Sequence, residues 1–146
     1  MAFDIRPLTL DDEPEWRALW TGYLTFYETT LADDVYRSSF ARMLSGAAGE
    51  FRGLVAARDG KLVGLTHYLF HRHGWRIEDV CYLQDLWVEP DHRGRGIARA
   101  LIEAVYGAAD AHGCGKVYWM TEETNTTARL LYDRIATKSG FIEYKR

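Results

Sequence analysis

The sequence predicts a mixed α/β fold in which helices flank one central, mostly antiparallel sheet. β-prone runs and segments with apolar residues at helical spacing follow one another in the order β-α-α-β-β-β-α-β-α-β. Asp59-Gly60 between two of the β-prone runs is a hairpin signal, which favours antiparallel pairing there. No linker, internal repeat or low-complexity stretch interrupts this order, so residues 1–146 are expected to form a single domain.

The composition argues against several classes of protein. Apolar residues at 47% and charged residues at 27% are globular values. The net charge of −3 argues against a nucleic-acid binder and permits a cationic substrate. No apolar run approaches the length of a membrane span, and charged residues near the start interrupt any signal peptide. Cys81 and Cys114 follow no disulfide or metal pattern, which indicates reduced thiols in a cytoplasmic protein.

The first strand is expected at 3–8 and the first helix directly after it. Thr9 and the Asp11-Asp12 pair supply helix-capping oxygens, and Pro14 suits the first helical turn. One face of this helix is unusually aromatic, with apolar residues at i, i+3, i+4, i+7, i+8 and i+11: Trp16, Leu19, Trp20, Tyr23, Leu24 and Tyr27. Core packing is the simpler interpretation of this face, and a substrate-binding wall is the alternative.

A second helix is expected at 32–45, followed by strands at 52–58, 61–71 and 79–88. Three histidines near the end of the second of these strands would share one face: His67, His71 and His73. A metal site needs ligands from more than one direction, and no neighbouring cysteine or carboxylate completes a set. We therefore expect no metal, and interpret the histidines as an exposed or substrate-facing row.

The remaining elements follow the same rules. A helix running to about 112 ends at His112-Gly113, and a short apolar strand is expected at 116–121. Thr124 or Asn125 caps a last helix, whose apolar face holds Ala128, Leu131, Tyr132 and Ile135. Ser139-Gly140 should end this helix, and residues 141–146 can form one final strand.

The most informative stretch is the turn between the strand at 79–88 and the next helix. Pro90 stops the strand, and Gly94 and Gly96 allow a ligand to approach a main chain whose free N–H groups meet the start of a helix. This arrangement predicts a phosphate site. Ile97-Ala98 after Gly96 excludes a Walker A loop, and Arg99 stands where a dinucleotide fingerprint needs a small residue.

The pattern R-x-x-G-x-A, formed by Arg93, Gly96 and Ala98, resembles the coenzyme A pyrophosphate loop of the GNAT N-acetyltransferase superfamily. A second motif of that family, N-x-x-A-x-x-L-Y, follows from Asn125 to Tyr132 in the expected order. The resemblance covers about 5–145. Two segments look especially like the yeast acetyltransferases that act on histones, polyamines or D-amino acids: Tyr-Leu-Gln-Asp-Leu and Trp-Met-Thr-Glu-Glu-Thr-Asn.

The resemblance implies the GNAT fold and an enzyme that transfers acetyl from acetyl-CoA directly to a primary amine. The amine could belong to a polyamine, an amino acid or a lysine side chain of a protein. The resemblance assigns the cofactor pyrophosphate to the turn and the pantetheine to the preceding strand, through Leu86, Trp87, Val88, Arg93, Gly94, Arg95, Gly96, Ile97 and Ala98. Asn125 would contact the pantetheine arm. Tyr132 would protonate the departing thiolate.

The group that accepts the amine proton is left open by the sequence. Polyamine-acetylating relatives carry Glu-Asp where this chain has Gln84-Asp85, and a glutamine cannot act as a base. Asp85 is the next candidate, although strand alternation directs it away from Gln84 unless a bulge intervenes. Glu122 and Glu123 are further candidates, each with solvated loop charge as the alternative interpretation.

Two further expectations concern partners and activity. Only one strand is expected after the last helix, and an unpaired edge invites a second copy of the chain, so a homodimer is expected. A non-catalytic acyl-CoA-binding regulatory module is the alternative to an enzyme. Tyr132 favours the enzyme, whereas the missing carboxylate at Gln84 keeps the alternative open.

Overall fold

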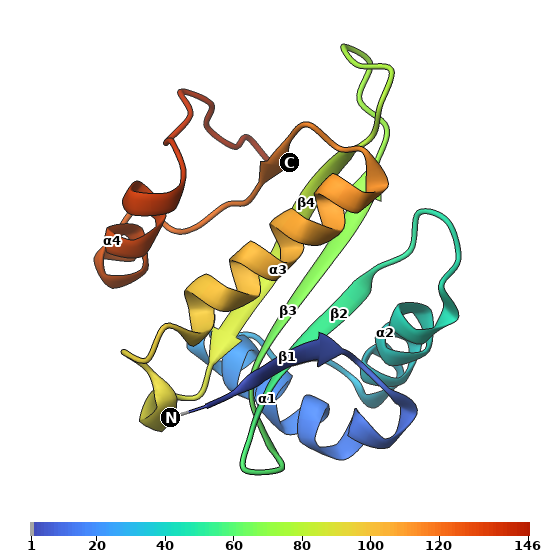
Figure 1. The fold of residues 1–146 in the computed structure, drawn as a ribbon, viewed down its shortest axis with the longest axis vertical. Helices are drawn as coiled ribbons and strands as arrows, with labels where there is room; N and C mark the ends of the chain where they lie inside the picture. The colour runs from blue at the N-terminus through green and yellow to red at the C-terminus, as the bar shows by residue number, and fades with distance from the viewer. Residues whose placement is uncertain (1) are drawn as a thin grey trace.

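The computed structural model describes residues 2–146 and contains one five-stranded sheet in the order β1-β2-β3-β4-β5 (Figure 1). The strands are β1 (Asp4–Pro7), β2 (Arg52–Arg58), β3 (Lys61–His71), β4 (Val80–Val88) and β5 (Val117–Tyr118). The first four pair antiparallel, and β5 joins β4 in parallel. The prediction of a mixed, mostly antiparallel sheet is confirmed.

Helices connect the strands close to the predicted positions. They are α1 (Glu13–Phe26), α2 (Asp33–Ser45), α3 (Ile97–His112) and α4 (Thr126–Ile135). Pro14 lies in the first turn of α1, as its missing N–H allows. Gly113 ends α3 in the left-handed region, with φ of +86°. None of the helices in residues 2–146 combines the length and hydropathy that a membrane crossing requires.

Two apolar clusters cover the two faces of the sheet. On one face α1 and α2 pack their aromatic residues, led by Trp16 and Phe40, on side chains of β2 and β3. On the other face α3, drawn along the sheet in Figure 1, contributes Leu101, Ile102 and Val105. β4 lies between both layers, so its residues face α3 and α1 in turn.

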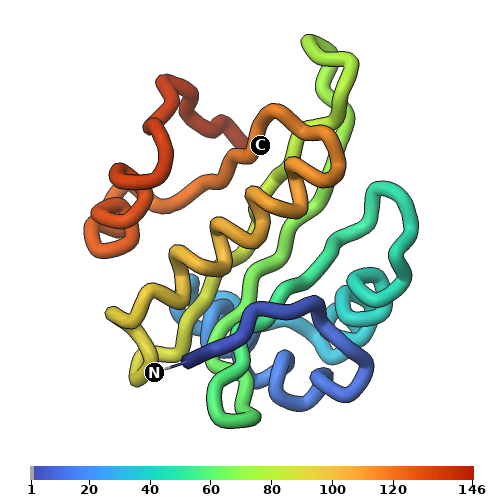
Figure 2. The backbone as a smooth tube through the Cα atoms, in the orientation of Figure 1, coloured from blue at the N-terminus to red at the C-terminus, as the bar shows by residue number. Residues whose placement is uncertain are grey.

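The C-terminal part differs from the prediction. α4 ends at Ile135, because the backbone of Ala136 is already extended, and residues 141–146 form no strand. A strand needs a partner edge for its backbone groups, and β5 presents only two residues. Figure 2 shows the chain after α4 turning back toward β5, and Glu143 lies near enough to Tyr82 to contribute to raising its pKa.

Candidate active site

The edge of β4 is open next to β5. In the described residues, β5 pairs with β4 through Cys81↔Val117 and Tyr82↔Tyr118, and the two strands then separate. β5 is therefore much shorter than the predicted strand at 116–121. From Leu83 onward, the backbone groups on this edge of β4 lack a partner in β5. An edge of this kind can accept an extended ligand through main-chain hydrogen bonds.

A β-bulge reshapes β4 at Gln84. His67 of β3 stands opposite Asp85, whereas Tyr68 stands opposite Leu83, so Gln84 is the extra residue. Leu83 and Leu86 both pack in the cluster on the α3 face. The alternation on either side of the bulge therefore puts Gln84 and Asp85 in succession on the α1 side. Asp85 can therefore lie on the same side as Gln84, which strand alternation without a bulge would prevent.

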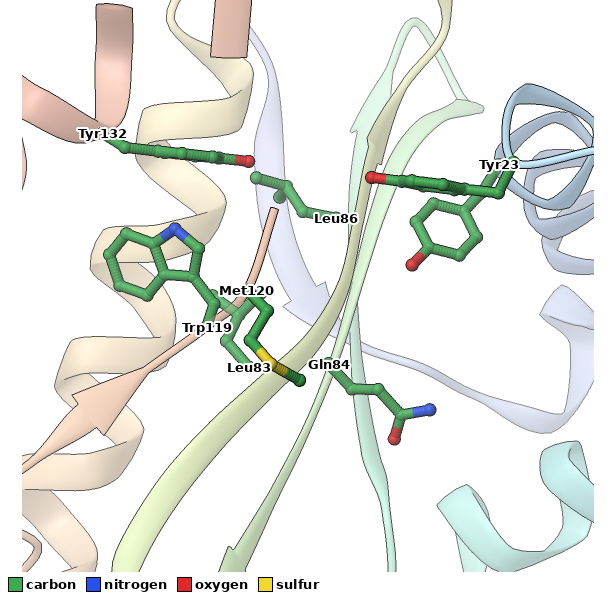
Figure 3. Close-up of a pocket in the computed structure, with 8 residues that line it drawn as sticks. Tyr23, Leu83, Gln84, Leu86, Trp119, Met120 and Tyr132 are labelled. Atoms are coloured by element: carbon green, nitrogen blue, oxygen red, sulfur yellow. The ribbon is translucent and has the colours of Figure 1, made fainter. Parts of the chain in front are cut away.

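A pocket opens between the edge of β4, α1 and α4. Its lining residues are Tyr23, Tyr27, Leu83, Gln84, Leu86, Trp119, Met120 and Tyr132. In Figure 3 the hydroxyl end of Tyr132 points toward Leu86 from one side, and Tyr23 stands on the other side. The core-packing interpretation is confirmed for Trp16 and Trp20, which are buried, whereas Tyr23 and Tyr27 line the pocket.

Tyr132 is half-buried, and its ring meets Trp119 edge-on at 5.4 Å between centroids. Burial, with a smaller contribution from Tyr27, raises the pKa of Tyr132 to about 12. The hydroxyl therefore keeps its proton at physiological pH. It can act as a hydrogen-bond donor inside the pocket.

Asp85 belongs to a buried polar chain behind the pocket. The indole N–H of Trp16 donates to Nε2 of His67 at 2.9 Å, and Nδ1 of His67 lies 2.8 Å from Oδ2 of Asp85. Asp85 is 6% exposed and His67 is 3% exposed. The pKa of Tyr23 is raised well above its ordinary value, chiefly by burial and further by the negative charge of the nearby Asp85.

The turn after β4 has the geometry of an anion site. Gly94 and Gly96 adopt φ of +75° and +83°, and a Cβ on either would meet no atom within 4 Å. The bond from Ala100 N to Gly96 O, 3.0 Å long, closes the first turn of α3, so the amides just before Ala100 are the unsatisfied donors of a helix start. An anion can approach these amides without a side chain in the way.

The neighbours of this turn have separate tasks. Nε of Arg93 donates to the carbonyl of Val88 at 2.9 Å, and its guanidinium lies 4.6 Å from the Trp87 ring centroid. Arg93 therefore fastens the turn to β4. Arg95 is exposed, Ile97 at the start of α3 is buried, and Ala98 is half-buried.

Asn125 is the N-cap of α4, which resolves the choice between Thr124 and Asn125. Its Oδ1 accepts from Ala128 N at 3.4 Å, and its Nδ2 lies 3.4 Å from Oγ1 of Thr121. Glu122 and Glu123 are exposed, and the charge of Glu122 contributes to raising the pKa of Tyr27, whose main cause is burial.

The expected row of exposed or substrate-facing histidines is wrong for His67, which is buried by α1. His71 lies 2.6 Å from the Tyr118 hydroxyl, and His73 packs against Trp75 in the loop beyond β3. Within residues 2–146 no three metal-binding side chains come together. No local pattern indicates the contact between Trp16 and His67, because the two residues lie 51 positions apart.

An N–H-rich turn, an open strand edge and an aromatic pocket in line define the class of the protein as an acyl-group transferase, and comparisons with known proteins identify its family. The profile described as "Acetyltransferase (GNAT) family" matches residues 14–136. The chain belongs to this family and is an N-acetyltransferase.

Individual relatives agree with this assignment. The chain is 36% identical to the D-amino-acid N-acetyltransferase HPA3 of Saccharomyces cerevisiae over 97% of its own length and 89% of that protein. A ribosomal-protein-alanine N-acetyltransferase from Brucella melitensis superposes with a TM-score of 0.82 at 28% identity, covering 100% of this chain and 99% of that chain. AAC(6')-Iy in complex with a bisubstrate analogue of CoA has the same fold, with a TM-score of 0.87 at 21% identity over 100% and 98% of the two chains.

Proposed function

We propose that this protein transfers the acetyl group of acetyl-CoA to the primary amine of a small cationic acceptor. The observation that carries the proposal is the alignment of three features along one edge of β4. The N–H groups at Gly94–Ile97 stand at one end, the unpaired edge from Leu83 to Val88 follows, and the Tyr132 hydroxyl faces Leu86. The relatives agree, since one is named a D-amino-acid acetyltransferase and another is described with a CoA bisubstrate analogue.

The residues present fit coenzyme A. The two glycines leave the amides of the turn open to a pyrophosphate, and the helix start adds partial positive charge. Leu86, Trp87 and Val88 provide the backbone along which a pantetheine arm would pair, and Asn125 stands at the start of α4. When bound, acetyl-CoA supplies the activated acetyl thioester. A backbone N–H of β4 would then polarise the thioester carbonyl.

Tyr132 is proposed to assist the departure of the thiolate. A free thiol has a pKa near 8.5, whereas that of Tyr132 is raised to about 12. Complete proton transfer between them would be uphill by about 5 kcal/mol, at about 1.36 kcal/mol per pKa unit. Tyr132 therefore acts mainly by donating a hydrogen bond to the sulfur as negative charge develops there. A single donor of this kind is typically worth about 10²–10³ in turnover.

The acceptor is proposed to be cationic, because a buried carboxylate lies directly behind the pocket wall. The Asp85 carboxylate has the His67 ring as its neighbour at 2.8 Å, and an incoming ammonium would compensate its negative charge. The acidic residues at the start of α2 are engaged in ion pairs of their own. Asp33 pairs with Arg17 and Arg37, and Asp34 with Arg37.

The proposal also includes a cytoplasmic location. Both cysteines, Cys81 and Cys114, are buried free thiols, which suits a reducing compartment.

The test is release of CoA thiol from acetyl-CoA in the presence of single acceptors. The panel holds polyamines, amino acids of both hands, aminoglycosides and a lysine-rich peptide, with neutral and anionic acceptors for comparison. We expect small cationic amines to be acetylated fastest. A chain that binds acetyl-CoA but acetylates no amine of the panel would contradict the proposed function, and faster turnover of neutral or anionic acceptors would contradict the acceptor class.

A further inference from the structure

We propose that Tyr23 is the residue that takes the proton from the attacking amine, passing its own hydroxyl proton to Asp85, while His67 and Trp16 position the carboxylate. This inference rests on the proposed function and names the base that Gln84 cannot supply. It joins three elements, α1, β3 and β4, that meet at the bulge.

Position is the first argument. Tyr23 lines the pocket and lies close enough to Asp85 for that carboxylate to raise the pKa of its hydroxyl. Asp85 itself is buried and is not part of the pocket lining within the described residues. An amine in the pocket therefore reaches the carboxylate through the hydroxyl of Tyr23. Gln84, the extra residue of the bulge, faces the pocket but has no basic atom.

The donors and acceptors in the row Trp16–His67–Asp85 determine where the imidazole proton lies. An indole N–H can only donate, so Nε2 of His67 must present its lone pair to Trp16. The proton of the neutral imidazole then sits on Nδ1, which donates to Oδ2 of Asp85. The carboxylate of Asp85 thus accepts a bond from His67 and lies close to the hydroxyl of Tyr23. Protonation of His67 would require breaking its bond to Trp16.

Among residues 2–146, no lysine or arginine forms an ion pair with Asp85. The groups around it are His67 of β3, Tyr23 of α1, Tyr27 at the C-cap of α1 and Tyr82 of β4. Burial is the main cause of the raised pKa of each of the three tyrosines, and Asp85 raises it further. Glu122 adds negative charge beside Tyr27. A buried anion without a cation partner is costly, so the site favours both an arriving ammonium and the uptake of its proton.

The proton of the bound ammonium reaches Asp85 through two coupled transfers. The N–H bond of the amine breaks as its proton moves to Oη of Tyr23, and the original O–H bond of Tyr23 breaks as that proton moves to Oδ of Asp85. The amine is left neutral, Tyr23 is unchanged, and Asp85 becomes a carboxylic acid that later returns its proton to solvent. No free tyrosinate forms, which agrees with the strongly raised pKa of Tyr23.

The experiment compares Tyr23→Phe with Tyr27→Phe across pH. Tyr27 lines the same pocket from the next turn of the same helix. Each variant is assayed for kcat/KM from about pH 6 to pH 10 with two amines of different pKa. At pH values below the amine pKa we expect Tyr23→Phe to lose about 10²–10⁴ in kcat/KM, the usual worth of a positioned proton acceptor. The loss should shrink as the pH passes the amine pKa, because the amine then arrives neutral.

Any loss in Tyr27→Phe should be independent of pH. A loss in Tyr23→Phe that is equal at all pH values, or absent, would overturn the relay and leave Tyr23 as a packing residue. If wild type acetylates no amine, the proposed function has failed instead. Asp85→Asn should show the same pH-dependent loss of kcat/KM. The double variant should lose little more kcat/KM than Tyr23→Phe alone, because both residues act in the same proton relay. Should Asp85→Asn fail to fold, the Tyr23→Phe profile decides alone.

Discussion

Replacing Gly96 with leucine should abolish binding of coenzyme A while the protein remains folded. Gly96 has φ of +83°, where a residue with a Cβ costs about 1–2 kcal/mol. The added Cβ meets no protein atom within 4 Å, so no further strain arises. The new side chain instead fills the space in front of the amides of the turn. Loss of two hydrogen bonds to a charged phosphate, at about 1.5–3 kcal/mol each, corresponds to about 10²–10⁴ in affinity.

Gly113→Leu is the matched control. Gly113 lies at the other end of α3, has φ of +86°, and also has nothing within 4 Å of its added Cβ. Both variants should lose about the same stability, seen as a fall in Tm of about 3–8 °C. Isothermal titration calorimetry with CoA should detect binding in wild type and Gly113→Leu and none in Gly96→Leu. Unchanged affinity in Gly96→Leu would refute the assignment of the turn as the pyrophosphate site.

Three further predictions concern chemistry, stability and assembly. Tyr132→Phe should retain CoA affinity and lower kcat by about 10²–10³; turnover within a few-fold of wild type would make Tyr132 a packing residue. Hydrogen bonds from Arg6 lower the pKa of Asp12 from 3.8 to about 2, which stabilises the fold by about 1–2 kcal/mol after allowance for the partly exposed arginine. A lowered pKa gives stability that is complete above about pH 4 and is lost as the pH falls toward 2. Asp12→Asn should therefore be less stable than wild type in urea at pH 7 and equal to it at pH 2, and an equal deficit at both pH values would contradict this reasoning. We also expect a homodimer, because the two-residue edge of β5 is unprotected and Phe141, Ile142 and Tyr144 are exposed; a monomer mass by light scattering at micromolar concentration would exclude it.

Much of the fold could be predicted because its signals are local. Asp59-Gly60 marks the β2–β3 turn, and both residues have positive φ there. Gly113 ends α3 where the helical spacing stops. Gly94 and Gly96 between a strand and a helix were sufficient to predict an open anion-binding turn, because each feature follows from the backbone freedom of glycine.

The C-terminal strand could not be predicted correctly, because its existence depends on another part of the chain. Residues 141–146 have the composition of a strand, but pairing needs an accessible edge of sufficient length. β5 offers two residues, because the chain leaves β4 after Tyr118 to open the pocket. The same separation that exposes the edge of β4 for a ligand removes the platform for a final strand. Local propensity carries no information about this competition.

The proposed base also depends on contacts that no local pattern encodes, although one residue of the sequence conflicts with the pattern of its own strand. Asp85 interrupts an apolar strand, between Leu83 and Trp87, where the layers on both faces require apolar side chains. A carboxylate can be buried there only if donors surround it, so an inward-facing Asp85 requires partners from elsewhere in the chain. The face it occupies is set by the bulge at Gln84, and its partners are set by the packing of α1 on β3. A residue that violates the apolar pattern of its own strand is where function is most expected. Burying its charge destabilises the fold, and such a residue is retained when it contributes to binding or catalysis.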